Sequence, residues 1–213
     1  MIRNMAALAG AGAGSALFGF GGWKDSAIFA QAGAVEAADT KTTLILLGTQ
    51  GGPNVNLMRG ETASVIVAGG QPYLVDCGYG TLRALTEAGI RFNDVRNIFL
   101  THLHDDHTSD LAAFLSHKWT GGSTNTNPPP AAVYGPYGSK AIVDAAIAFF
   151  KADTEIRMVD EGRTIRPETL YAGHDLSAPK MTEVFRDERV TVQAVENTHF
   201  PERAKRARCP RQR

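Results

Sequence analysis

Three histidines and one aspartate that can bind a metal ion lie within six residues of one another. They are His102, His104, Asp106 and His107 in the run HLHDDH. Imidazole nitrogens and carboxylate oxygens suit divalent cations such as zinc, which they bind at roughly 2.0–2.2 Å. On an extended chain His102, His104 and Asp106 share a face, and a turn after His104 directs Asp106 and His107 toward a second point. The motif therefore predicts a metal site that can serve two ions.

The strands that must carry these side chains end where the histidines begin. An apolar stretch at residues 95–101 (VRNIFLT) predicts a strand that ends directly before His102. Another stretch at 190–195 (VTVQAV) predicts a strand that ends shortly before His199. We therefore expect His199 to supply a third nitrogen beside His102 and His104.

Other polar residues near these strands have two interpretations each. Asp76 ends a predicted strand at 73–76, where it either accepts a hydrogen bond that orients a ligand histidine or begins a turn. Gly51-Gly52 either lets backbone N–H groups approach an anionic substrate or forms an ordinary turn. His117 and His174 have no metal-binding neighbours in sequence, and we expect them to be surface or locally bonded residues.

Short apolar runs alternate with helical stretches and are separated by Gly and Pro, which predicts an α/β layered domain. Gly69-Gly70 joins two of the runs as a hairpin, and Gly89 ends a helix. The expected strands are 43–47, 64–68, 73–76, 95–101, 131–134 and 190–195. The expected helices are 81–88, a short helix through Leu115, and one that begins at Ser139 with Val143, Ile147 and Phe150 on one face.

Charge is distributed unevenly along the 213 residues. The 22 Lys/Arg balance the 22 Asp/Glu, but residues 201–213 hold six basic residues and one acid, so residues 1–200 carry 16 basic against 21 acidic. An acidic body offers little to RNA, whose phosphates reward many Lys/Arg contacts, and we do not expect nucleic acid as a partner. With only Cys77 and Cys209, neither a disulfide framework nor a cysteine-rich zinc module organises the fold.

The N-terminal stretch is typical of an export signal. Residues 4–23 contain no charged side chain, follow Arg3 and are rich in Ala and Gly. We assign residues 1–38 to an export-signal-like leader. Its glycines lower hydrophobicity and helix stability, so we expect no stable membrane span. The leader predicts a periplasmic or secreted protein, and a cytoplasmic protein with an uncleaved leader is the alternative.

The cluster His102-Leu103-His104-Asp105-Asp106-His107 matches the HxHxDH signature of the metallo-β-lactamase superfamily. The stretches 47–49 (LGT), 75–81 (VDCGYGT) and 99–102 (FLTH) resemble its ribonuclease Z and arylsulfatase-like branch. We place the domain at 39–200. The resemblance implies an α/β fold, an αββα sandwich with up to two zinc ions at one edge. It implies that His102, His104 and His199 bind the first ion and that Asp106 and His107 bind the second.

The resemblance also implies a departure at the end of the chain. Members of the superfamily continue beyond the third histidine with an aspartate that bridges both metals and with a last histidine. No residue after His199 matches either one. We therefore expect a C-terminally truncated domain whose second half is incomplete, followed by an aberrant basic tail at 201–213.

For an intact relative the resemblance implies hydrolysis by metal-bound water, with Asp106 orienting or deprotonating that water. Our leading hypothesis is a zinc-dependent hydrolase of phosphate or sulfate esters that acts on a small anionic ester, because an exported protein would not meet precursor tRNA. One alternative is a ribonuclease Z-type endonuclease of tRNA 3′ ends. Another is a non-catalytic fragment that binds one zinc ion or none. The sequence leaves a homodimer open.

Overall fold

The computed structural model describes residues 41–121, 128–197 and 199. The expected leader at 1–38 and the basic tail at 201–213 lie outside these described residues. Within the described ranges, no helix is both long and apolar enough to cross a bilayer.

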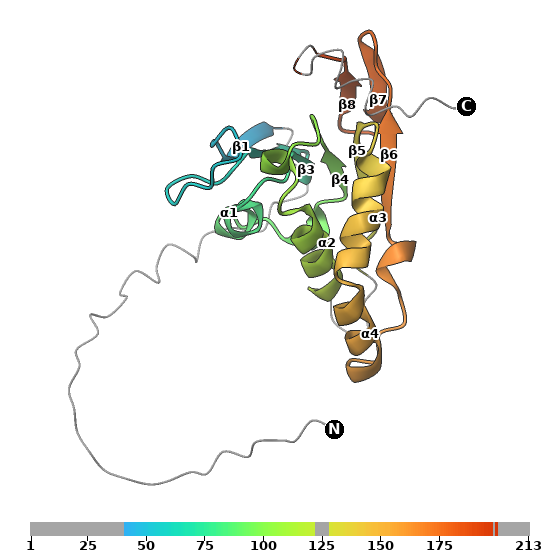
Figure 1. Cartoon of the computed structure of the whole chain (residues 1–213). Helices are drawn as coiled ribbons and strands as arrows, with labels where there is room; N and C mark the ends of the chain where they lie inside the picture. Colours follow the sequence, from blue (N-terminus) through green and yellow to red (C-terminus); the bar gives the residue numbers. More distant parts are fainter. Residues whose placement is uncertain (1–40, 122–127, 198, 200–213) are drawn as a thin grey trace, which may run out of the picture. The chain divides into compact units, whose positions relative to one another are not determined.

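A six-stranded mixed sheet is the central element, with the strands in sequential order from β1 to β6 (Figure 1). β1, β2 and β3 are antiparallel neighbours, whereas β3, β4, β5 and β6 run parallel. β7 and β8 form a separate antiparallel pair. The strands are β1 (Thr42–Gly48), β2 (Ala63–Ala68), β3 (Gln71–Val75), β4 (Asn97–Phe99), β5 (Ala131–Pro136), β6 (Tyr171–Leu176), β7 (Thr182–Arg186) and β8 (Thr191–Ala194).

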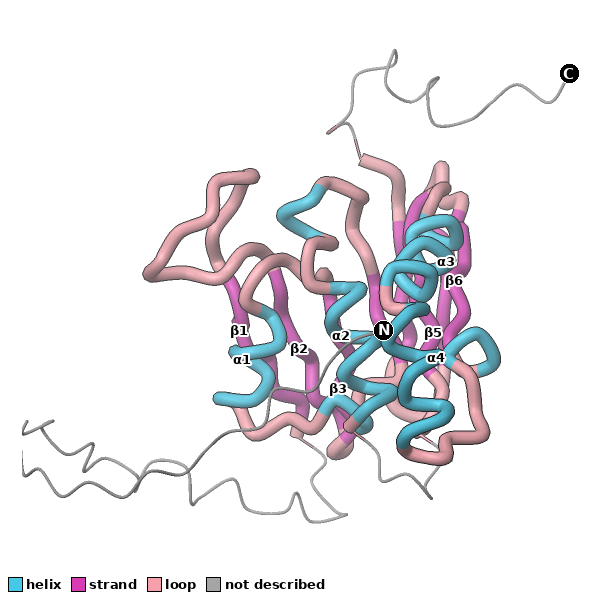
Figure 2. Tube along the Cα trace, turned by 60° about the horizontal axis from the view of Figure 1, so that its bottom comes forward, coloured by secondary structure: helices cyan, strands magenta, loops and turns pink. Residues whose placement is uncertain are grey.

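Helices cover one face of the sheet (Figure 2). They are α1 (Thr81–Glu87), α2 (Leu111–Thr120), α3 (Ser139–Phe149) and α4 (Lys151–Asp160), with the 3-10 turns η1 (Phe92–Asp94), η2 (Asp105–His107) and η3 (Pro167–Thr169). Successive strand residues point to opposite faces, so every second apolar residue meets the helices. Val65, Leu74, Ile98 and Val133 are fully buried in one cluster with Phe114 of α2. This cluster fixes the edge of the sheet that carries the candidate site.

The opposite face of the sheet carries aromatic rings that contact the β7–β8 pair. Phe99 of β4 stacks on Tyr134 of β5 with ring centroids 5.3 Å apart. Phe185 of β7 meets Phe99 at 5.5 Å and Tyr134 at 5.4 Å. The described residues therefore form three layers: helices, the six-stranded sheet, and the β7–β8 pair.

The predicted α/β layering is confirmed, and so is the hairpin. Gly69 and Gly70 have φ of 52° and 77°, the left-handed conformation that both central residues of a type I′ turn require. The predicted strand at 95–101 is shorter than expected and pairs as β4 over Asn97–Phe99. It ends early because the backbone N–H of Thr101 donates to the Asp76 side chain rather than to a strand. The predictions did not include α4, β6 and β7, whose sequences lack a continuous apolar run.

Candidate metal centre

The candidate site lies where β3 and β4 end beside each other. The two strands are parallel and Val75 is paired with Phe99, so the residues that follow them emerge at the same edge. The backbone N–H of Asp76 donates to the carbonyl of Phe99 at 2.9 Å. Asp76 and Thr101 are thereby brought together, although 25 positions separate them in the chain.

After β4 the chain turns back on itself through η2. His104 precedes this turn with extended backbone dihedral angles. The N–H of His107 donates to the carbonyl of His104 at 3.1 Å, and the carbonyl of His107 accepts from the N–H of Cys77 at 2.8 Å. The turn therefore presses Asp106 and His107 against the segment that follows β3. This is the turn after His104 that the spacing of the motif predicted.

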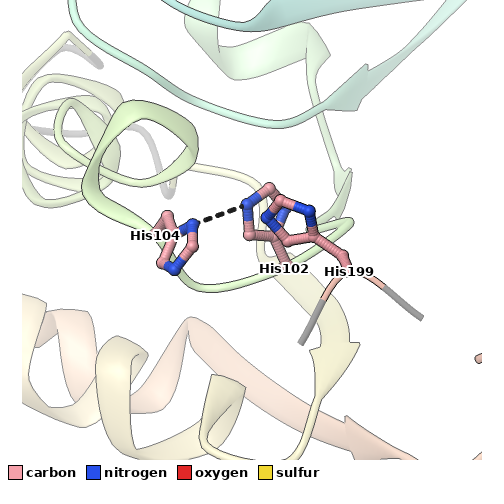
Figure 3. Close-up of side chains that lie close together, drawn as sticks. All are labelled: His102, His104 and His199. Carbon is pink, nitrogen blue, oxygen red and sulfur yellow. Dashed lines mark hydrogen bonds between the residues drawn. The ribbon is translucent and has the colours of Figure 1, made fainter. Parts of the chain in front are cut away.

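His102, His104 and His199 form one group whose ring nitrogens converge (Figure 3). One ring nitrogen from each lies within 4.8 Å of those of the other two. The Nε2 atom of His102 lies 3.1 Å from Nδ1 of His104. His199 reaches the group from beyond β8, and its ring centroid is 4.8 Å from that of His102. The structure thus brings together the three histidines that we expected to bind one ion.

His102, Asp106 and His107 form a second group, again with one donor atom from each within 4.8 Å of the others. Nε2 of His107 lies 3.6 Å from Oδ2 of Asp106. Asp106 is only 5% exposed, and its Oδ2 accepts a hydrogen bond from the N–H of Gly52 at 2.8 Å. Because His102 belongs to both groups, the two candidate metal positions are adjacent.

Both groups fit a divalent cation. Two ligands of a tetrahedral ion with bonds of about 2.0–2.1 Å are about 3.3 Å apart. The 3.1 Å between the His102 and His104 nitrogens and the 3.6 Å between the Asp106 and His107 atoms are close to this spacing. Neutral imidazoles and a carboxylate also match the donors that zinc prefers.

The electrostatics of the group favour neutral His102. Burial, followed by the nearby rings of His107, His104 and His199, lowers the pKa of His102 to about 4. A cation is harder to form where water is displaced and where neighbouring groups take up positive charge. At neutral pH His102 therefore offers a lone pair, as a metal ligand must.

Asp76 combines the two interpretations that the sequence left open. Its Oδ2 lies 2.8 Å from Nδ1 of His107, so the carboxylate orients that ring. Its backbone has φ of 60°, a left-handed turn conformation that aspartate tolerates better than most residues. The residue is 2% exposed, and its side chain also accepts the N–H of Thr101 at 2.8 Å.

Gly52 and Thr101 have positions that the sequence did not reveal. The sequence left Gly51-Gly52 with two interpretations, an approach of N–H groups to an anionic substrate or an ordinary turn, and neither one includes the contact that the structure shows, in which the N–H of Gly52 donates to Asp106. The sequence assigned Thr101 no role of its own, only a place at the end of a strand and in the stretch FLTH, yet its hydroxyl lies within hydrogen-bonding distance of Asp76, His102 and His107. Its place directly before the first histidine was the available signal.

His117 and His174 lie outside both groups, and both are exposed as expected. The ring of His174 stacks on Tyr134 with centroids 4.8 Å apart. The ring of His117 lies 6.2 Å from that of Phe92. These are local contacts with neighbouring aromatic side chains.

A sequence model of the metallo-beta-lactamase superfamily matches residues 58–192, a span that includes the cluster from His102 to His107. This chain belongs to the metallo-beta-lactamase superfamily. The crystal structure of human tRNase Z, short form, has the same fold, with a TM-score of 0.52 at 22% sequence identity over 73% of this chain and 60% of that one. The expected metallo-β-lactamase fold is therefore confirmed.

Curated relatives within the superfamily are named ribonuclease Z. The protein of that name from Mycobacterium sp. (strain KMS) is 35% identical over 139 residues, which are 65% of this chain and 44% of the relative. The one from Mycobacterium avium (strain 104) is 30% identical over 156 residues, 73% of this chain and 54% of the relative. The chain spans about half the length of the curated relatives it matches.

These relatives contradict two expectations. The leading hypothesis of a phosphate or sulfate ester hydrolase with a small anionic substrate is wrong, because the relatives are named ribonuclease Z, the alternative. The expectation that nucleic acid is not a partner is wrong for the same reason. It depended on the expected export of the protein and on the net charge of residues 1–200, and a net charge does not say where the charges lie. Several of the counted acids are paired with Lys or Arg on α3, α4 and β7, as in Lys140–Asp144 and Arg186–Glu183.

Proposed function

We propose that this chain carries the metal centre of a zinc-dependent endonuclease of the ribonuclease Z type, which cleaves precursor tRNA at its 3′ end. One observation carries the proposal: two metal-binding groups that share His102 occur in a chain 30–35% identical to proteins named ribonuclease Z. The donor set of imidazoles and a carboxylate supports zinc as the metal.

The ligands divide between the two groups. His102, His104 and His199 would hold one ion, and Asp106 and His107 would hold the other, next to His102. Bound zinc lowers the pKa of a water ligand to about 7 and stabilises negative charge on a phosphate oxygen. The protein's contribution is to hold the donor atoms in a fixed orientation, since orientation of the reacting groups makes a large contribution to the rate of such hydrolysis reactions.

Asp106 would orient the attacking water. Its carboxylate is buried, and the N–H of Gly52 fixes Oδ2 at 2.8 Å. Nε2 of His107 lies 3.6 Å from the same oxygen. A carboxylate held in this way could accept a proton from a water molecule beside it.

The test is RNA cleavage by the purified 213-residue chain loaded with zinc. The substrate is a 5′-labelled precursor tRNA that has a 3′ trailer, and a mature tRNA without a trailer serves as the substrate control. We expect a single cut at the trailer junction. Replacing both His102→Ala and His104→Ala should abolish cleavage and reduce bound zinc.

A matched control replaces His174→Ala, an exposed histidine outside both groups. This variant should bind zinc and cleave like the unmodified chain. If the chain binds two equivalents of zinc and leaves the precursor intact, the proposed activity is wrong. If the double histidine variant keeps its full zinc content, the assignment of the metal centre is wrong.

A further inference from the structure

Thr101 lies at the point where one carboxylate and two histidines meet. Its hydroxyl is 2.8 Å from Oδ2 and 3.1 Å from Oδ1 of Asp76. The same oxygen is 3.2 Å from Nδ1 of His102 and 3.3 Å from Nδ1 of His107. The backbone N–H of Thr101 also donates to Asp76, at 2.8 Å, so the residue is anchored independently of its hydroxyl.

The hydrogen-bonding capacity of these groups determines where the protons lie. An ionised carboxylate only accepts, and a hydroxyl has one proton to donate and two lone pairs. The hydroxyl proton of Thr101 therefore goes to Asp76, and a lone pair remains for a donor. The Nδ1 atom of His102 can then only be that donor, which leaves Nε2 of the neutral ring as the atom with the lone pair.

The lone pair of His102 is thereby directed to the candidate metal positions. Its Nε2 is the atom that lies 3.1 Å from Nδ1 of His104. His107 is oriented in the same sense by a direct contact, since its Nδ1 lies 2.8 Å from Oδ2 of Asp76. One buried carboxylate thus serves both rings, directly for His107 and through Thr101 for His102.

We propose that Thr101 is a positioning residue whose hydroxyl sets the Nδ1–H tautomer of His102, the imidazole shared by both metal-binding groups. The proposal rests on the metal centre assigned under the proposed function. A partner of this kind, behind a ligand histidine, is generally worth 10–100-fold in metal affinity. Because His102 belongs to both groups, the hydroxyl of Thr101 should influence the affinity of both metal positions. Thr101 does this without binding metal itself.

The experiment compares Thr101→Val, which keeps the shape and the backbone N–H but lacks the hydroxyl, with Thr101→Ser, which keeps the hydroxyl. The first readout is the tautomer of His102 in the metal-free protein, from the ¹⁵N chemical shifts of the imidazole nitrogens. We expect protonated Nδ1 in the unmodified chain and in Thr101→Ser. In Thr101→Val we expect a mixture of both tautomers.

The second readout is zinc affinity, measured by competition with a chromophoric chelator. Thr101→Val should bind zinc at least about 10-fold more weakly, and Thr101→Ser should stay within a few-fold of the unmodified chain. The matched control is Thr108→Val, because the hydroxyl of Thr108 donates to the backbone carbonyl of His104 rather than to a ring. This control should leave the tautomer of His102 unchanged.

The proposal is overturned if the unmodified chain carries its proton on Nε2 of His102, an observation that needs no variant. It is also overturned if Thr101→Val keeps both the tautomer and the affinity, or if Thr101→Ser loses as much affinity as Thr101→Val. None of these readouts requires RNA. Absence of RNA cleavage with the expected tautomer and affinities would count against the proposed function alone.

Discussion

Asp76 is not a proposed metal ligand itself, but it orients His107, which is one. Replacing Asp76→Asn should therefore cost the metal centre the His107 ligand without disturbing the fold. Asparagine tolerates the left-handed φ of 60° at this position. Its amide oxygen must accept the N–H of Thr101, so its NH₂ group then faces Nδ1 of His107. An amide NH₂ can only donate, and His107 must move its proton to Nε2. The lone pair that pointed toward Asp106 is then lost.

The expected size of the effect follows from the hydrogen bond that changes. The Asp76–His107 contact is 2.8 Å long, buried and made by a carboxylate. Hydrogen bonds to charged groups contribute about 1.5–3 kcal/mol. Because every 1.4 kcal/mol is tenfold in a binding constant, zinc affinity should fall by about 10- to 150-fold. Competition with a chelator measures the affinity, and circular dichroism checks that the variant is folded.

The matched control is Asp175→Asn. Oδ1 of Asp175 accepts the N–H groups of Gly138 and Lys140 at the start of α3, and asparagine can do the same. Zinc affinity should therefore stay unchanged in this variant. A folded Asp76→Asn protein that binds zinc as tightly as the unmodified chain would refute the orientation of His107 by Asp76.

Two further predictions concern a buried charge and a close backbone contact in the fold. Burial lowers the pKa of Lys118 to about 8, whereas an unfolded lysine titrates near 10.5. Between these two pH values the unfolded state binds more protons than the folded state, so the free energy of unfolding rises with pH. Urea unfolding measures the free energy of unfolding of Lys118→Met and of the unmodified chain. The value of the variant minus that of the unmodified chain should fall by about 2.5 kcal/mol between pH 7 and 10. A difference that does not depend on pH would mean that the ammonium is not buried as a charge. A Cβ atom on Gly78 would overlap the backbone oxygen of Asp106 and lie 2.7 Å from Cβ of Glu61, so Gly78→Ala should lower the free energy of unfolding by about 1–3 kcal/mol or more. Gly51→Ala, whose Cβ would meet nothing within 4 Å, should change it by less than about 0.5 kcal/mol, and equal losses in the two variants would contradict this account.

The sequence predicted much of the candidate site because its main residues are neighbours in the chain. His102, His104, Asp106 and His107 lie within six positions, and a strand end followed by a turn is enough to direct them to adjacent points. His199 could be added because it also follows a predicted strand. The elements that alternate clearly between apolar runs and glycine turns, such as the hairpin at Gly69-Gly70, were predictable for the same local reason.

The partner class was not predictable in this way. A net charge averages over the whole chain, whereas recognition of a polyanion depends on charge near the site and on bound metal. The sum of acids and bases in residues 1–200, together with the expected export, therefore led to a wrong exclusion of nucleic acid. Comparison with relatives named ribonuclease Z corrected it.

The sequence by itself determined which donor atoms are available and that they lie near a strand end, since these are properties of residue type and local spacing. Only the tertiary structure decided how the donors are held. The parallel pairing of β3 with β4 brings Asp76 to Thr101 and His107, and the loop after β1 brings the N–H of Gly52 to Asp106. These contacts join residues 25 to 54 positions apart. Hydrogen bonds of that separation arise from the register of a sheet and the closure of a core, and no local pattern of residues encodes them.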